Sequence, residues 1–254
     1  MRKLFTLASL VALSMVACTN EEPKGEANEK GQVHFDLNLS NEVDVTRANV
    51  SCTTPAAEDF ALTIDGVSGE YNAQYASIAE FHEDNYLRYG SYQATVVAGD
   101  LANEGYDKPT FVGSAEFEVK ARKATEVEVT ASIANALVMV ETTEAFNNYF
   151  VGGRTLKLTT AAGNEFDVTA QTEPLFIAPA AFTISGTAIK QPAQSGAEGS
   201  VVALEYEPEE VDAQTLYTVK LDVKDAGRAT LEITLNEKLV ESEDIEQELN
   251  DYSQ

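Results

Sequence analysis

Apolar side chains recur at every second position in one segment after another of this chain. The pattern is clearest over residues 33–39, where Val33, Phe35, Leu37 and Leu39 alternate with polar residues. A period of two belongs to a β-strand with one buried and one solvated face, whereas a helix repeats every 3.6 residues. The alternation predicts further strands over residues 60–64, 92–96, 117–119, 127–133, 156–158, 182–184, 217–223 and 231–235.

Turn-forming sequences separate these segments, among them DGVSGE at 65–70, AGDLANEG at 98–105 and KDAG at 224–227. Many short strands joined by regular turns are typical of antiparallel β-sandwiches. Only ASIAEFH at 76–82 and EAFNNYF at 144–150 suggest short helices or packed loops. The predicted fold class is therefore all-β with little helix.

The strand pattern restarts near Asn135, because TEVEVTASI ends one strand and ALVMVETT begins the next with little between them. A chain of 254 residues can hold one large domain or two small ones. We expect two antiparallel β-sandwich domains, at residues 32–134 and 135–240, followed by an acidic tail at 241–254. The alternative is one elongated sandwich.

The chain begins with Met1, Arg2 and Lys3, followed by the uncharged and mostly apolar run LFTLASLVALSMVA. This is the pattern of a signal peptide over residues 1–17, and the run is too short for a transmembrane helix, which needs about 20 apolar residues. The run stops at Cys18, where the sequence resembles the lipobox of bacterial lipoproteins. The resemblance implies that the Cys18 thiol carries lipid; an ordinary secreted protein with an unpaired cysteine is the alternative.

Residues 18–31 are polar, without apolar periodicity, and are expected to form a flexible leash between the lipid and the fold. Glu21 and Glu22 resemble a signal that directs lipoproteins of gut anaerobes to the outer face of the outer membrane. The expected location is thus the outer membrane, lipid-anchored and exposed at the cell surface. An acidic linker without any signal is the other interpretation.

The formal net charge is −25, from 17 basic and 42 acidic residues. Nucleic acid and anionic lipid are poor partners for such a chain, so no nucleic-acid partner is expected and the membrane is reached through the lipid anchor. With Cys18 acylated, Cys52 is the one cysteine left, which excludes an intramolecular disulfide. Stability must then come from packing.

The segment GSYQATVVAG at 90–99 has the spacing of transthyretin-like extracellular sandwiches. Together with the Cys18 motif, VTRA at 45–48 and YTVKLDVKDAGRATLEITLNEK at 217–238, it resembles the fimbrillin-like surface lipoproteins of gut anaerobes, from Cys18 to about Leu239. The function of that family is largely unknown. The resemblance implies two β-sandwich domains and a structural or adhesive role, as a pilus subunit, tip or anchor.

The resemblance also implies a mechanism of assembly. An arginine-specific protease would cut between Arg47 and Ala48, after the first strand, and the vacated groove would accept a strand from another fimbrial subunit. Residues 229–240 alternate in the manner of a donor strand, although a resident strand of the second domain explains the same pattern.

Catalysis needs convergent titratable groups, and the only histidines are His34 and His82. His34 is expected on the solvated face of the first strand and His82 in a loop. Without metal-ligand spacing, a phosphate loop or a nucleophile elbow, the sequence predicts no enzyme, no cofactor and no metal. Asp65 and Glu70 in DGVSGE offer oxygen ligands for calcium, but a hairpin turn explains them equally well.

A glycan-binding surface lipoprotein is the alternative function, with a host or microbial surface ligand. Sugar-binding surfaces favour large exposed aromatic side chains, and the chain has no Trp. Four tyrosines between two predicted strands are candidates for exposed positions: Tyr71, Tyr75, Tyr86 and Tyr89.

Overall fold

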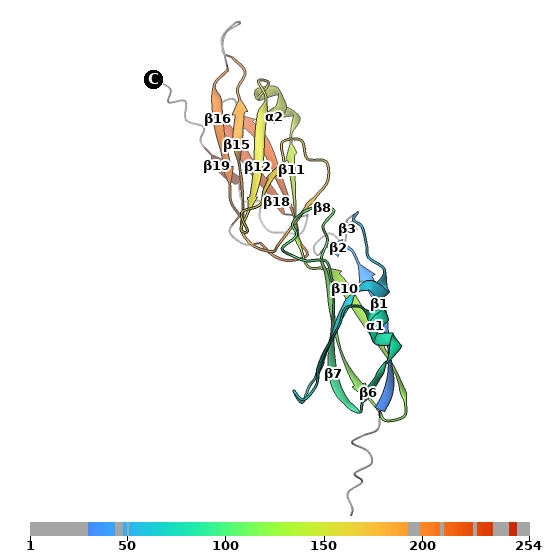
Figure 1. Cartoon of the computed structure of the whole chain (residues 1–254). Helices are drawn as coiled ribbons and strands as arrows, with labels where there is room; N and C mark the ends of the chain where they lie inside the picture. The colour runs from blue at the N-terminus through green and yellow to red at the C-terminus, as the bar shows by residue number, and fades with distance from the viewer. Residues whose placement is uncertain are drawn as a thin grey trace, which may run out of the picture.

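The computed structural model describes residues 30–43, 48–49, 51–192, 199–208, 211–225, 228–235 and 244–247. Their backbone is mainly β-strand, which confirms the all-β class with little helix. The alternating segments named above lie in strands, apart from Phe60, which directly precedes the strand at Ala61–Gly66. The strands form two lobes that follow each other along the molecule (Figure 1).

One seven-stranded sheet builds the first lobe, in the order β5-β4-β7-β9-β10-β1-β6. The two edge strands, β5 and β6, both place side chains in or against the same hydrophobic cluster, so the sheet curls around one core. The strands are β1 (Lys30–Ser40), β4 (Ala61–Gly66), β5 (Asn72–Tyr75), β6 (Tyr86–Arg88), β7 (Gly90–Ala98), β9 (Phe111–Val119) and β10 (Ala124–Ile133). Separately, β2 (Glu42–Val43) pairs antiparallel with β3 (Ala48–Asn49).

Two sheets build the second lobe, in the orders β19-β18-β17-β11-β14-β8 and β13-β12-β15-β16. A second hydrophobic cluster takes side chains from both sheets, which therefore face each other as a sandwich. The first sheet contains β8 (Gly105–Tyr106), β11 (Ala136–Thr142), β14 (Leu175–Ile177), β17 (Leu216–Asp225), β18 (Arg228–Leu235) and β19 (Asp244–Gln247); the second contains β12 (Arg154–Thr160), β13 (Glu165–Asp167), β15 (Phe182–Ile189) and β16 (Val201–Tyr206).

Two pairings depart from the expected antiparallel arrangement. Strand β1 runs parallel to β10, and β11 runs parallel to β17. The alternation of apolar residues fixes which face of a strand is buried but carries no information about the direction of its neighbour.

The helices α1 (Ile78–Glu83) and α2 (Glu144–Tyr149) lie in the two segments for which short helices were considered. Each starts at a hydroxyl N-cap: Ser77 accepts a hydrogen bond from the backbone N–H of Glu80 at 3.0 Å, and Thr143 accepts one from that of Phe146 at 3.1 Å. A 3-10 turn, η2 (Ala57–Asp59), precedes β4. Within the described ranges, no helix has the length and apolar character needed to cross a membrane.

Asn135 lies where the two clusters meet, between β10 and β11, and its side chain is fully buried. Its Oδ1 accepts a hydrogen bond from the backbone N–H of Thr110 at 2.6 Å, and its Nδ2 donates to the carbonyl oxygen of Ile177 at 3.4 Å. Leu137 and Phe176 pack into the first cluster although they follow Asn135 in the sequence. The division into domains at this residue stays a prediction, although β11 and β14 of the second lobe contribute these two side chains to the first core.

Replacing Asn135 by Ala is expected to lower the free energy of unfolding by about 1–3 kcal/mol, because the buried N–H of Thr110 loses its acceptor. The measurement is urea-induced unfolding followed by circular dichroism. Asn148→Ala, at an exposed position of α2, is the control and should change the free energy by less than about 0.5 kcal/mol. Equal urea midpoints for the Asn135 variant and the parent chain would contradict the assigned role.

Candidate functional site

Strand β1 is the strand that the family resemblance marks for exchange, and its two edges are paired to very different extents. On one edge it pairs with β10 over nine residues, from Gln32 opposite Ala124 to Ser40 opposite Ser132. On the other edge the ladder with β6 covers only positions 30–32. The next contacts on that edge come from the α1 region, and they form a clasp of two hydrogen bonds rather than a ladder.

The clasp is made by Asn85 and His82. The backbone N–H of Val33 donates to the carbonyl oxygen of Asn85 at 2.8 Å, and the backbone N–H of Phe35 donates to Nε2 of His82 at 3.2 Å. Most of the hydrogen bonding that retains β1 therefore comes from β10.

The inner face of β1 closes the first core. Val33 is completely buried and Phe35 is 4% exposed. The Phe35 ring makes edge-to-face contacts with Phe81 at 5.3 Å and Phe117 at 5.6 Å between centroids. Burial of such a side chain contributes roughly 1.5–3 kcal/mol, so removal of β1 would expose an apolar groove that favours a replacement strand.

The start of β1 is fixed by the turn between β9 and β10. The backbone N–H of Gln32 donates to the carbonyl oxygen of Lys123 at 3.1 Å. A Cβ atom at Gly31 would lie 2.5 Å from the carbonyl oxygen of Lys120, so the close approach of the turn requires glycine there.

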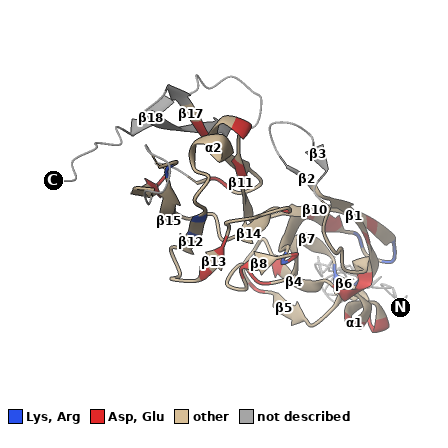
Figure 2. Cartoon of the chain, turned by 90° about the horizontal axis from the view of Figure 1, so that it is seen from above, with Lys and Arg blue, Asp and Glu red and all other residues tan. Residues whose placement is uncertain are grey.

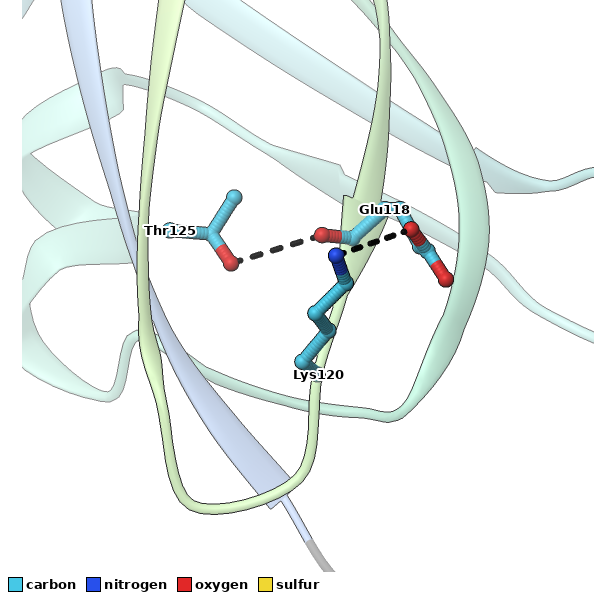
Figure 3. Close-up of polar contacts among 3 residues, drawn as sticks. All are labelled: Glu118, Lys120 and Thr125. Carbon is cyan, nitrogen blue, oxygen red and sulfur yellow. Dashed lines mark hydrogen bonds and ion pairs between the residues drawn. The ribbon is translucent and has the colours of Figure 1, made fainter.

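Figure 3 shows the polar contacts beside this turn. The Thr125 hydroxyl donates to the carbonyl oxygen of Glu118 at 3.4 Å, and Lys120 forms an ion pair with the Glu118 carboxylate at 3.5 Å. Both charged side chains are more than 60% exposed, so the ion pair contributes little to stability.

The two histidines stack on each other, with ring centroids 4.5 Å apart and an angle of 16° between the rings. His34 is exposed on the outer face of β1, as predicted. The prediction of a loop for His82 is wrong, because Ser77 caps a helix there and Ile78 and Phe81 bury its inner side. His82 is thereby aimed at the backbone of β1.

The environment of His82 favours the neutral ring. Burial lowers its pKa below the ordinary value of 6.5, and the neighbouring His34 lowers it further, while Glu58 and Glu126 act in the opposite direction with smaller effect. A neutral ring keeps Nε2 available as the acceptor for the N–H of Phe35.

Two of the three predicted site residues fall outside the described residues: Cys18 and Arg47. Ala48 opens β3, where its backbone pairs with Val43 of β2. Arg47 directly precedes β3, in the segment 44–47 that links the two paired strands. Lipidation of Cys18 and cleavage after Arg47 stay predictions.

The proposed donor segment is resident in the second lobe over the part that is described. Residues 229–235 belong to β18, which pairs with β17 on one side and β19 on the other. The interpretation as a resident strand is confirmed for these residues, and 236–240 lie outside the described ranges.

The DGVSGE segment forms the predicted hairpin turn between β4 and β5, in which the backbone N–H of Gly66 donates to the carbonyl oxygen of Tyr71. The Asp65 carboxylate accepts a hydrogen bond from the Asn72 amide. Within the described part of the chain, no three His, Cys, Asp or Glu side chains are grouped to hold a metal ion.

The four candidate tyrosines come together around one cavity of about 1000 Å³. Tyr86 and Tyr89 are exposed as expected, whereas Tyr71 and Tyr75 are partly buried against the first core. Tyr92 also lines the cavity, although its place in an alternating strand marks it in the sequence only as a core residue.

The curled sheet and the two facing sheets place the chain among the β-sandwich proteins. The family described as a domain of unknown function (DUF4493) matches residues 29–251, and the chain belongs to this family. Comparison with curated proteins gave no match.

The fold is similar to that of a fimbrial assembly protein from Parabacteroides distasonis, with 12% identity and a TM-score of 0.50 over 86% of this chain and 99% of that chain. Two weaker similarities are a candidate cell adhesion protein from Bacteroides eggerthii (11% identity, TM-score 0.40, 78% and 88% coverage) and candidate polysaccharide binding proteins from Bacteroides thetaiotaomicron (8%, 0.38, 81% and 98%). The similarity to the fimbrial assembly protein bears on the fold alone.

The His82 clasp predicts a pH-dependent stability. In the unfolded chain His82 has its ordinary pKa, whereas in the folded chain its pKa is lower. As the pH falls, His82 therefore takes up a proton at a higher pH in the unfolded chain than in the folded chain. The contribution of His82 to stability is therefore present above about pH 6.5 and lost as the pH falls below it. The melting temperature should drop between pH 7.5 and pH 5.5, and it should drop less in His82→Gln, which cannot titrate and still offers an acceptor. The same drop in both proteins would show that His82 does not couple to folding.

Proposed function

We propose that the chain is a lipid-anchored protein of the cell surface with a structural or adhesive role, a fimbrial subunit, tip or anchor held in the outer membrane through Cys18. The observation that carries the proposal is the setting of β1, a strand with a buried apolar face and one extensively paired edge. The fold similarity to a fimbrial assembly protein supports it. The chain acts through assembly or contact and not as an enzyme.

Cleavage after Arg47 would turn β1 into a replaceable strand. Residues 30–43 lie on the N-terminal side of that bond, so after the cut the N-terminal fragment is held by non-covalent contacts: those of β1 with β10, β6, the β9–β10 turn and the clasp, and the two-residue pairing of β2 with β3. A strand from another copy, with apolar side chains at every second position, can pair with the free edge of β10 and refill the groove.

The same cut would separate the body from its membrane anchor, because Cys18 also precedes Arg47 in the sequence. An uncut chain is then an anchored monomer, whereas a cut chain is held by strand exchange. In this proposal the state of the Arg47–Ala48 bond decides between anchor and subunit.

The test is brief digestion of the folded protein, lacking the signal at residues 1–17, with an arginine-specific protease, followed by mass analysis and native sizing. We expect one cut, after Arg47, with loss of the N-terminal fragment and the appearance of larger species. Arg88, Arg122, Arg154 and Arg228 lie in strands or in the β9–β10 turn and should resist a brief treatment.

Arg47→Ala is the matched control and should remain uncut and monomeric under the same conditions. Resistance at Arg47 in the parent chain, or a clean cut that leaves only a stable monomer, would contradict assembly by strand exchange and leave an unprocessed anchored adhesin.

A further inference from the structure

The tyrosine-lined cavity lies between the two ends of the curled first sheet. The hairpin turn before β5 supplies one wall, and β6 with the residues leading into β7 supplies the other. Lys30, the first residue of β1, completes the lining. A volume of about 1000 Å³ is at the upper end of the range for small-molecule sites, so the cavity can hold a ligand of several rings.

The floor of the cavity is already ordered by contacts among its own side chains. Tyr71 packs edge-to-face on Tyr92, with 5.5 Å between ring centroids and an angle of 89°, and its hydroxyl lies 3.2 Å from that of Tyr75. The Tyr92 hydroxyl donates to the carbonyl oxygen of Arg88 at 2.9 Å, and the Tyr92 ring stacks on Phe117. Because these groups are held in place without a ligand, little side-chain freedom is lost on binding.

The rim is aromatic and open to solvent. Tyr86 is 49% exposed and Tyr89 is 48% exposed, whereas Tyr92 on the floor is 5% exposed. A tyrosine ring offers a flat apolar face together with a polar hydroxyl, which suits a ligand that is itself apolar on one face and polar at its edge. Two such rings beside a cavity mark a contact surface.

The charges around the cavity balance, unlike those of the whole chain. The lining contains two basic residues, Lys30 and Arg88, and two acidic residues, Glu70 and Asp84, whereas the whole chain carries 17 basic and 42 acidic residues. Figure 2 shows acidic residues on elements of both lobes, with few basic ones. A strongly anionic ligand is repelled by the surrounding surface, and a cationic one gains no net attraction within the cavity.

From these features we propose that the cavity binds a neutral oligosaccharide. The carboxylates of Glu70 and Asp84 accept hydrogen bonds from sugar hydroxyls, Lys30 and Arg88 donate to sugar oxygens, and the rings of Tyr86 and Tyr89 pack against the C–H faces of the pyranose rings. This activity does not depend on cleavage at Arg47, so the uncut chain should have it.

The experiment is calorimetric titration of the purified full chain with neutral hexasaccharides of glucose, xylose and mannose, and with a hexamer of galacturonic acid as the anionic probe. At least one neutral hexasaccharide should bind and the anionic hexamer should not. Tyr86→Ala and Tyr89→Ala should each weaken binding about tenfold, and Tyr86→Phe, which keeps the ring face, should weaken it less.

Val201→Ser removes a side chain that is 66% exposed on β16, in the second lobe, and should leave binding unchanged. Unaltered melting temperatures show that the tyrosine variants fold; if one does not, exposed Glu70→Gln replaces it and should also weaken binding. Absence of binding to all three neutral hexasaccharides, binding of the anionic hexamer alone, or affinities indifferent to both alanine variants would overturn the proposal.

Discussion

The parallel pairing of β1 with β10 keeps the first core closed. It is the longer of the two ladders that β1 makes, and it holds Val33 in the first core and Phe35 against the rings of Phe81 and Phe117. Hydrogen bonds of a ladder are satisfied by any strand of the right register, and apolar contacts are tolerant of exchange between similar side chains. The first lobe therefore needs a strand beside β10. Whether that strand comes from the same chain or from another copy matters far less.

The second lobe is joined to the first by directional polar contacts, buried at Asn135 and partly exposed at Glu104, which tolerate substitution much less. Asn135 connects the loop before β9 with the end of β14. Glu104 accepts hydrogen bonds from the hydroxyl of Thr160 and the amide of Asn164 at 2.6 and 2.8 Å, and from the backbone N–H of Ala178 at 2.9 Å. Directional bonds of this kind fix how the segment at 104–106 meets the second lobe, so exchange of β1 need not disturb the junction.

The alternation of apolar residues was sufficient to predict β1, β4, β7, β10 and β17, because each has one buried and one solvated face. The alternation did not predict β8, because a strand of two residues shows no period. This strand lies between β7 and β9 in the sequence but pairs with β14 of the second lobe. The role of His82 depends on a contact across 47 positions of sequence, and the cavity depends on the curl that brings β5 near β6. No local sequence pattern predicts the His82 contact or the cavity. The sequence did identify four of the tyrosines that line the cavity as candidates for a binding surface.

The two proposed activities meet at one short strand. Strand β6 is an edge strand whose one sheet partner is β1, paired over positions 30–32, and β6 carries Tyr86 and Arg88 at the cavity. Loss of β1 removes Lys30 from the lining and leaves β6 without its ladder. A replacement strand restores the rim only if it extends far enough to pair with β6, while a shorter one fills the groove and leaves the cavity incomplete. If both proposals hold, the length of the incoming strand decides whether a subunit assembled by strand exchange keeps the proposed sugar site.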